Sequence, residues 1–186
     1  MQLHSLALFQ LISSFDFGDI LPGHNPRRLI LKAYLIGREL GLCEADLIFL
    51  QQAVILHDIG KLYLPKRIII KTDPLDEDER LQVESHPGLG AALLQELGFP
   101  AEIIQAVWSH HENWNGSGYP RKLRGGEIPL AGSIVRVVDT LDAIQSPRPY
   151  QCQLGREEAF QKIRAGRGTF FNPDVIDVLP KLLAVH

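Results

Sequence analysis

The strongest constraint on the fold is the spacing of the apolar residues, which recur every three to four positions along nearly the whole chain. This period places them on one side of a helix, and the run from residue 26 to residue 42 is a clear case. Pro26 suits the first turn of that helix and Gly41 suits its exit. The only tempting strand is Ile68-Ile69-Ile70, and three residues do not make a sheet. The sequence therefore predicts an all-α fold, a bundle of helices.

Further helices are predicted at residues 44–57, 76–86, 89–97, 101–112, 130–146, 156–165 and 173–185. Acidic residues open the helix at 76–86, where carboxylates favour the positive end of the helix dipole. Residues 113–126 contain four glycines and a proline, and they predict a structured loop. Residues 1–18 predict an N-terminal helix that packs on the bundle, or contacts a second copy or a regulatory protein. Residues 19–186 predict the main domain.

Composition narrows the class of protein. Apolar types make up 45% of the 186 residues and charged types 22%, close to the averages for soluble globular chains. The 19 basic side chains against 22 acidic ones offer no surface for long nucleic acid. No stretch approaches the run of about 18 apolar residues that a membrane helix needs. Two cysteines, Cys43 and Cys152, are too few for a disulfide framework or a thiolate metal site, which favours a reducing cytoplasm.

Five of the seven histidines lie at the edges of predicted helices: His24, His57, His86, His110 and His111. For any one of them alone, a contact between an imidazolium and a helix C-terminus is sufficient explanation. Two carboxylates accompany them, Asp58 directly after a histidine and Asp139 within the apolar run 134–144. A carboxylate in such a run needs a partner, because burying an unpaired charge is costly.

Imidazoles and carboxylates without thiolates are the ligands of Fe, Mn, Zn, Co or Ni sites. These residues are far apart in sequence, so the site must be assembled by the packing of several helices. The pattern predicts a metal centre in the bundle.

Three motifs carry a resemblance to a known family. His57-Asp58-Ile59-Gly60-Lys61 resembles the HD superfamily of metal-dependent phosphohydrolases. The segments His110-His111-Glu112, Gly116-Ser117-Gly118-Tyr119-Pro120 and Ile128-Pro129 narrow the resemblance to the HD-GYP family. It covers nearly the whole chain from about residue 24. It implies hydrolysis of cyclic di-GMP, a bacterial second messenger, to pGpG, with GMP as a further product.

The resemblance also implies which residues bind metal: His24, His57, Asp58, His86, His110, His111 and Asp139. Asp58 would bridge two ions, with His24, His57 and Asp139 completing one coordination sphere and the other three histidines the second. Some family members bind a third metal through a Glu four residues before the first histidine. That position is Ile20 here, so we expect two divalent ions, Fe or Mn.

In the implied chemistry, two divalent ions about 3.5–4 Å apart share a hydroxide, lower its pKa and neutralise charge that develops on phosphorus. Lys61 would face the phosphate beside the bridging Asp58, and Asp142 would support Asp139 from one helical turn away. Tyr119, Gly118 and Arg148 would bind the substrate. The plainer alternatives are a solvated loop lysine at Lys61 and loop packing at Tyr119.

Three positions depart from the family pattern. Asn115 replaces the usual Asp of the loop, and Pro147 stands where an Asp is common. A basic residue is expected two positions after Tyr150, where Cys152 stands, so of the usual Arg and Lys pair only Arg148 remains. These departures leave two alternatives to the phosphodiesterase: a catalytically weak HD-GYP-like signalling or binding module, and an HD phosphohydrolase acting on another nucleotide.

Overall fold

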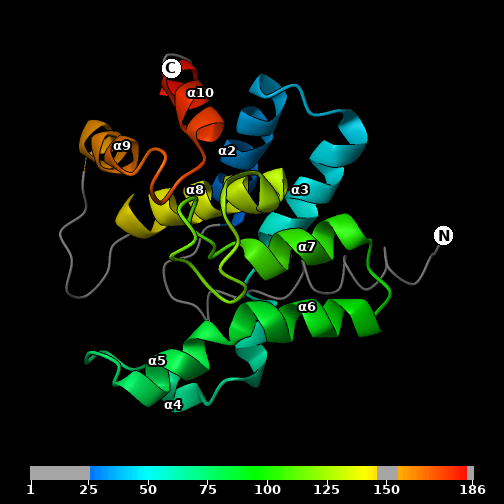
Figure 1. Ribbon diagram of the computed structural model, residues 1–186, viewed down its shortest axis with the longest axis vertical. Coiled ribbons are helices and arrows are strands. Elements are labelled where there is room, and N and C mark those ends of the chain that lie inside the picture. Colours follow the sequence, from blue (N-terminus) through cyan, green and yellow to red (C-terminus); the bar gives the residue numbers. More distant parts are fainter. Residues whose placement is uncertain (1–25, 146–154, 184–186) are drawn as a thin grey trace.

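The computed structural model describes residues 26–145 and 155–183, and within these ranges the chain is helical and forms no strand (Figure 1). The α-helices are α2 (Pro26–Glu39), α3 (Glu44–Leu56), α4 (Lys66–Ile69), α5 (Glu77–Glu84), α6 (His86–Glu96), α7 (Ala101–Ser109), α8 (Leu130–Gln145), α9 (Arg156–Ala165) and α10 (Pro173–Leu183). Two 3₁₀ helices, η2 (Ile59–Tyr63) and η3 (Gly125–Glu127), lie between them. The all-α prediction is confirmed. The predicted helix at residues 1–18 lies outside the described residues.

Helix α8 is the central element of the bundle and contacts α2, α3, α7, α9 and α10 (Figure 1). Most of the apolar side chains of α8 are buried, among them Ile134, Val137 and Val138. They meet fully buried residues of other helices such as Leu50 and Ile103 in one continuous core. Burial on this scale is the main stabilising contribution to a helical domain of this size. No described helix has the length and apolarity that a membrane crossing requires.

The junction between α5 and α6 differs from the prediction. The sequence predicts that a helix ends at His86 and that the next begins at Leu89, with Pro87 as the break. In the structure α5 ends at Glu84 and α6 already begins at His86, with Ser85 as the capping residue of both helices. The prediction is wrong here because a proline in a first helical turn needs no N–H partner and starts a helix well.

The connection between α3 and α5 is also more ordered than predicted. The sequence indicates only a loop there, whereas the structure contains η2 and the short α4, in which Ile68 is buried. Gly60 of η2 packs on α6 so closely that a Cβ would lie 2.6 Å from the backbone nitrogen of Gly90. This contact fixes the chain after α3 against the start of α6, and both segments carry predicted metal ligands.

Candidate metal centre

Three of the histidines have the same local geometry. The Nδ1 atoms of His57, His86 and His110 lie 2.6–2.7 Å from the carbonyl oxygens of Val54, Val83 and Val107, each three residues earlier. A carbonyl oxygen only accepts hydrogen bonds, so Nδ1 of each ring carries the proton and donates it. The Nε2 atom of each ring is therefore left with a lone pair for another partner.

The secondary structure explains this orientation. Each of the three carbonyl groups lies in the last turn of a helix, α3, α5 or α7, where backbone carbonyls lack a partner within the helix. A histidine just after such a turn satisfies one carbonyl with Nδ1–H and points Nε2 away from the helix. The signal in the sequence is the spacing Val-x-x-His, which occurs at all three helix ends. Apolar periodicity predicts the helix ends, whereas the ring orientation that follows from this spacing was not among the predictions.

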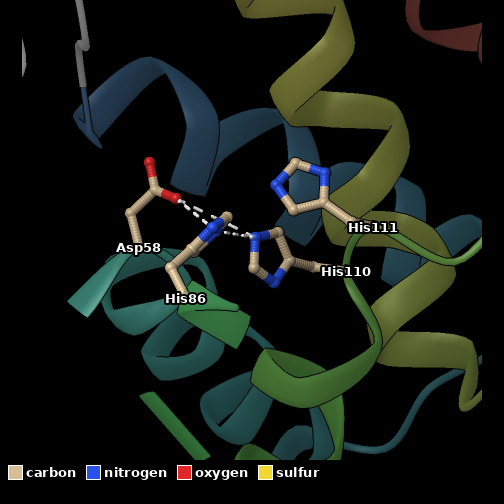
Figure 2. Close-up of side chains that lie close together, drawn as sticks. All are labelled: Asp58, His86, His110 and His111. Carbon is tan, nitrogen blue, oxygen red and sulfur yellow. Dashed lines mark hydrogen bonds and ion pairs between the residues drawn. The ribbon is translucent and has the colours of Figure 1, made fainter. Parts of the chain in front are cut away.

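The lone pairs of two of these rings converge with a carboxylate oxygen (Figure 2). His86 Nε2 lies 3.2 Å from His110 Nε2 and 3.2 Å from Asp58 Oδ1, and His110 Nε2 lies 3.9 Å from the same oxygen. With His111, the four residues offer ligand atoms that all lie within 4.8 Å of one another. Converging lone pairs repel one another unless a proton or a cation lies among them. The donor set therefore fits a divalent transition metal.

The second oxygen of Asp58 faces a different group. His57 Nε2 lies 3.5 Å from Asp58 Oδ2 and 3.8 Å from Asp139 Oδ1. The rings of His57 and His110 meet edge to face, with their centroids 5.1 Å apart. Asp58 therefore lies between two sets of ligands, as a bridging role requires. That role and the ligand assignments remain predictions.

The pKa values of these residues favour the binding of a cation. Burial alone would raise the pKa of the Asp58 carboxyl, but the neighbouring His57 ring, the Lys61 ammonium and the His86 ring hold it well below its usual range. Burial lowers the pKa of His110 and of His111 well below that of a free imidazole. Metal ligands must be deprotonated, and these groups already are near neutral pH.

Lys61 and Tyr119 both lie at the cluster. Lys61 Nζ is 2.6 Å from Asp58 Oδ2 and its side chain is only 22% exposed, so it is not a solvated loop lysine. The Tyr119 ring stacks on His111 with the centroids 4.8 Å apart. Burial raises the pKa of the Tyr119 hydroxyl, so this group keeps its proton and can donate a hydrogen bond.

The loop at residues 113–126 is fixed by Glu112, a residue of the His110-His111-Glu112 motif for which no role was predicted. Its buried carboxylate accepts hydrogen bonds from the backbone N–H of Arg121 (2.7 Å) and of Leu123 (3.1 Å). Gly118 packs on the same segment, where a Cβ would lie 2.3 Å from the backbone nitrogen of Asn113. The loop therefore folds back onto the end of α7 and brings Tyr119 to His111. The signal available in the sequence was a carboxylate directly after two predicted ligands.

Asn115 fits this loop in spite of the departure from the family pattern. Its Oδ1 accepts a hydrogen bond from the backbone N–H of Ser117 at 3.0 Å. The backbone N–H of Asn115 donates to the carbonyl of Thr169 at 2.9 Å. An aspartate could make the same two contacts, so the substitution removes a charge and keeps the turn. It alters the electrostatics of the loop more than its shape.

The predicted supporting residue Asp142 is almost fully buried and pairs with Arg28 of α2. Arg28 Nε lies 2.8 Å from Asp142 Oδ1, and its Nη2 contacts the same oxygen. This pair ties α2 to α8 one helical turn beyond Asp139 and so positions the two helices. The predicted ligand His24 and the predicted substrate residue Arg148 lie outside the described residues, as do Pro147 and Cys152.

The fold is found in solved structures. The crystal structure of a cyclic GMP-AMP-specific phosphodiesterase from Vibrio cholerae superimposes with a TM-score of 0.71 and 24% identity, over 98% of this chain and 49% of that one. Bd1817, described as an HDG"Y"P protein from Bdellovibrio bacteriovorus, superimposes with a TM-score of 0.72 and 19% identity, over 96% of this chain and 57% of that one. At these identities the likeness shows the fold alone.

Sequence comparison identifies relatives at higher identity. A cyclic di-GMP phosphodiesterase of Thermotoga maritima is 39% identical over 169 residues, which are 90% of this chain and 46% of that protein. The cyclic di-GMP phosphodiesterase response regulator RpfG of Xanthomonas campestris is 38% identical over 92% of this chain and 46% of its own length. The chain thus spans less than half the length of these two relatives.

A family model described as "HD domain" matches residues 20–175. The chain therefore belongs to the HD domain family, and its resemblance to the HD-GYP proteins is confirmed.

Proposed function

We propose that this chain is a metal-dependent phosphodiesterase that opens cyclic di-GMP to the linear dinucleotide pGpG, with GMP as a further product. The observation that carries the proposal is the convergence of ligand atoms from Asp58, His86, His110 and His111 within 4.8 Å. The names of the two relatives described above support cyclic di-GMP as the substrate.

Two divalent ions, Fe or Mn, would be held by residues on the two sides of Asp58. His86, His110 and His111 would hold one ion, and His57, Asp139 and His24 the other, with Asp58 shared between them. Bound divalent ions supply positive charge for a phosphodiester and lower the pKa of water. The convergence of imidazole and carboxylate donors, without a thiolate, supports Fe or Mn over a structural zinc site.

The residues around the ligands would orient the substrate. Lys61 lies beside Asp58 and would donate a hydrogen bond to a phosphate oxygen, where a fixed positive charge stabilises the transition state. Tyr119, stacked on His111 with its hydroxyl protonated, would donate a hydrogen bond to the nucleotide. Gly118 would allow the backbone of the loop to approach the ligand. Arg148 would bind a phosphate farther along the substrate.

A second cyclic dinucleotide is a specific alternative. The 3'3'-cGAMP-specific phosphodiesterases 3 and 2 of Vibrio cholerae are each 32% identical to this chain, over 90% and 92% of it. The loss of charge at Asn115, and of a base at Cys152, favours the other two alternatives, a weakly catalytic signalling module and a hydrolase for another phosphorylated nucleotide. The same assay separates all of them.

The experiment is product analysis on protein loaded with Fe²⁺ under anaerobic conditions and, separately, with Mn²⁺. Cyclic di-GMP, 3'3'-cGAMP and a mononucleotide are each incubated with the wild type and with Asp58→Ala as the inactive control. We expect pGpG from cyclic di-GMP with the wild type only. Turnover of the mononucleotide alone would favour a hydrolase for another phosphorylated nucleotide. Tight binding of cyclic di-GMP without any product would favour the signalling module.

A further inference from the structure

Arg136 of α8 lies beside the metal centre, although the mechanism described above does not use it. It precedes Asp139 by one helical turn, and Asp139 lies 3.8 Å from His57. Its Nη2 donates a hydrogen bond of 3.2 Å to Oδ1 of Asn113, which follows His111 by two residues. The guanidinium group therefore lies between α8 and the beginning of the loop that carries Tyr119.

The hydrogen bonds of this guanidinium leave most of its donors unused. Nη1 donates to Thr140 Oγ1 at 3.3 Å and Nη2 to Asn113, so two of about five N–H groups have oxygen partners. The buried Nε has none, and the group lies 5.8 Å from the centroid of the Phe171 ring. Among the described residues no carboxylate forms an ion pair with Arg136.

Several other described arginines form ion pairs, whereas Arg121, like Arg136, forms none. Arg28 pairs with Asp142, and Arg167 pairs with Asp177 through two hydrogen bonds of 2.6 and 2.7 Å. A partly buried cation without such a partner costs free energy, and a bound anion would recover it. The guanidinium of Arg121 contacts residues of α7, whereas Arg136 lies one turn from Asp139 and contacts Asn113. A bound anion at this place would give the Arg136 guanidinium the ion pair that it lacks among the described residues.

We propose that Arg136 binds the second phosphate of the cyclic dinucleotide, the one that is not being hydrolysed. Lys61 lies at Asp58, among the ligands, and serves the scissile phosphate. Arg136 lies on the side of His111 and Tyr119 and beyond ion-pair distance of Asp58 and Asp139, so it serves a more distant anion. This assignment rests on the proposed function. It also supplies a cation that compensates for the missing base near Cys152.

The test compares two substrates with metal-loaded protein. Arg136→Met removes the charge and keeps an unbranched apolar stem. We expect KM for cyclic di-GMP to rise about tenfold, equivalent to about 1.4 kcal/mol, and kcat to change by less than about twofold. Bis-p-nitrophenyl phosphate has no second phosphate, so its kinetics should not change. Arg136→Lys keeps the charge but not the planar fork, and KM should rise by a smaller factor.

Arg121→Met is the matched control. The Arg121 guanidinium also lies over an aromatic ring, 4.4 Å from the Trp108 centroid, with one hydrogen bond to Gln105 and buried nitrogens that have no partner. Both of these neighbours belong to α7, and among the described residues no hydrogen bond or ion pair joins the Arg121 side chain to a predicted ligand. We expect unchanged kinetics on both substrates. If the role of Arg136 is purely structural, Arg136→Met should instead slow the hydrolysis of both substrates equally and have a lower melting temperature than the wild type.

The outcomes separate this inference from the proposed function. If the wild type hydrolyses cyclic di-GMP and Arg136→Met matches it on both substrates, or weakens both equally, the inference is overturned and the function stands. If the wild type cleaves only bis-p-nitrophenyl phosphate, the function fails, and equilibrium dialysis with cyclic di-GMP decides on Arg136. Weaker binding by Arg136→Met then supports the inference, and equal or absent binding overturns it. If Arg136→Met does not fold, Arg136→Lys provides the same comparison.

Discussion

Gly60 packs directly on the backbone of His86, so that a Cβ on Gly60 would lie 2.0 Å from the His86 carbonyl oxygen. The contact joins η2, which begins just after Asp58, to the first residue of α6. It explains how two predicted ligands that are 28 positions apart come within 3.2 Å of one another. The distance between them depends on a position where only glycine fits.

Gly60→Ala is therefore expected to separate Asp58 from His86. The neighbouring atoms belong to backbone, which cannot move aside as a flexible side chain can, so overpacking should cost about 1–3 kcal/mol of the free energy of unfolding. The variant should melt at a lower temperature and bind less metal. Calorimetry and elemental analysis of the purified protein measure both effects.

Gly126→Ala serves as the control for this substitution. A Cβ at Gly126 would meet no atom within 4 Å, although the residue lies in the loop that folds onto the metal centre. Its melting temperature and metal content should match those of the wild type. If Gly60→Ala also matched the wild type, the close packing of η2 on α6 would not be what holds Asp58 and His86 together.

The metal content itself is the second prediction. Protein purified under metal-replete anaerobic conditions should carry about two transition-metal ions per chain, as a binuclear site requires. His86→Ala should lose one ion preferentially, because His86 Nε2 lies 3.2 Å from Oδ1 of Asp58, whereas His57 lies near Oδ2. Asp58→Ala should lose both, since its two oxygens face the two groups of ligands.

Asp46→Ala is the matched control. It removes an exposed carboxylate from α3, the helix that precedes Asp58 in the chain. It should bind as much metal as the wild type. Elemental analysis that finds a single ion in the wild type, or unchanged metal in Asp58→Ala, would exclude the bridging role of Asp58.

The sequence predicted most of the helices because apolar periodicity depends on local spacing. It did not predict η2 or α4, which are too short for a period to be visible, and it placed the start of α6 three residues late. Both errors lie between α3 and α6, where packing of η2 against α6 decides the conformation. Contacts between segments distant in sequence have no local signal.

In the candidate site, too, some features follow from local sequence and others depend on the packing of distant segments. The helix-end positions of His57, His86 and His110 follow from local sequence, and the Val-x-x-His spacing could have given the ring orientation as well. Which oxygen of Asp58 faces which ring depends on the packing of α3, α6 and α7. The proximity of Arg136 to Asn113, 23 positions earlier, likewise depends on how the loop folds back onto α8.

Glu112 provides a third prediction. Its carboxylate satisfies two backbone N–H groups of the loop, so Glu112→Ala would leave both without their partner at a cost of about 1–3 kcal/mol each. The loop should open, Tyr119 should leave His111, and phosphodiesterase activity should fall. Limited trypsin digestion reports the opening directly, because the released segment contains Arg121, Lys122 and Arg124.

Glu112→Gln tests the cause. The amide keeps one acceptor oxygen and nearly the same shape, so it should retain one of the two hydrogen bonds and give an intermediate rate of cleavage. Cleavage at the wild-type rate in Glu112→Ala would show that the loop is held by other contacts, such as the packing of Gly118 on Asn113.

Removal of the metal gives the last prediction. In the folded protein the Asp58 carboxylate and the lone pairs of His86 and His110 converge, whereas the unfolded chain offers no such arrangement. An ion that binds only the folded state stabilises it by about 4 kcal/mol at a thousand times its Kd. A chelator should therefore lower the melting temperature of the wild type and of Asp46→Ala, and added Mn²⁺ should restore it in both. Asp58→Ala lacks the shared ligand, so its melting temperature should respond to neither reagent. A response to Mn²⁺ in Asp58→Ala as large as that of the wild type would show that the stabilising ion binds elsewhere on the protein.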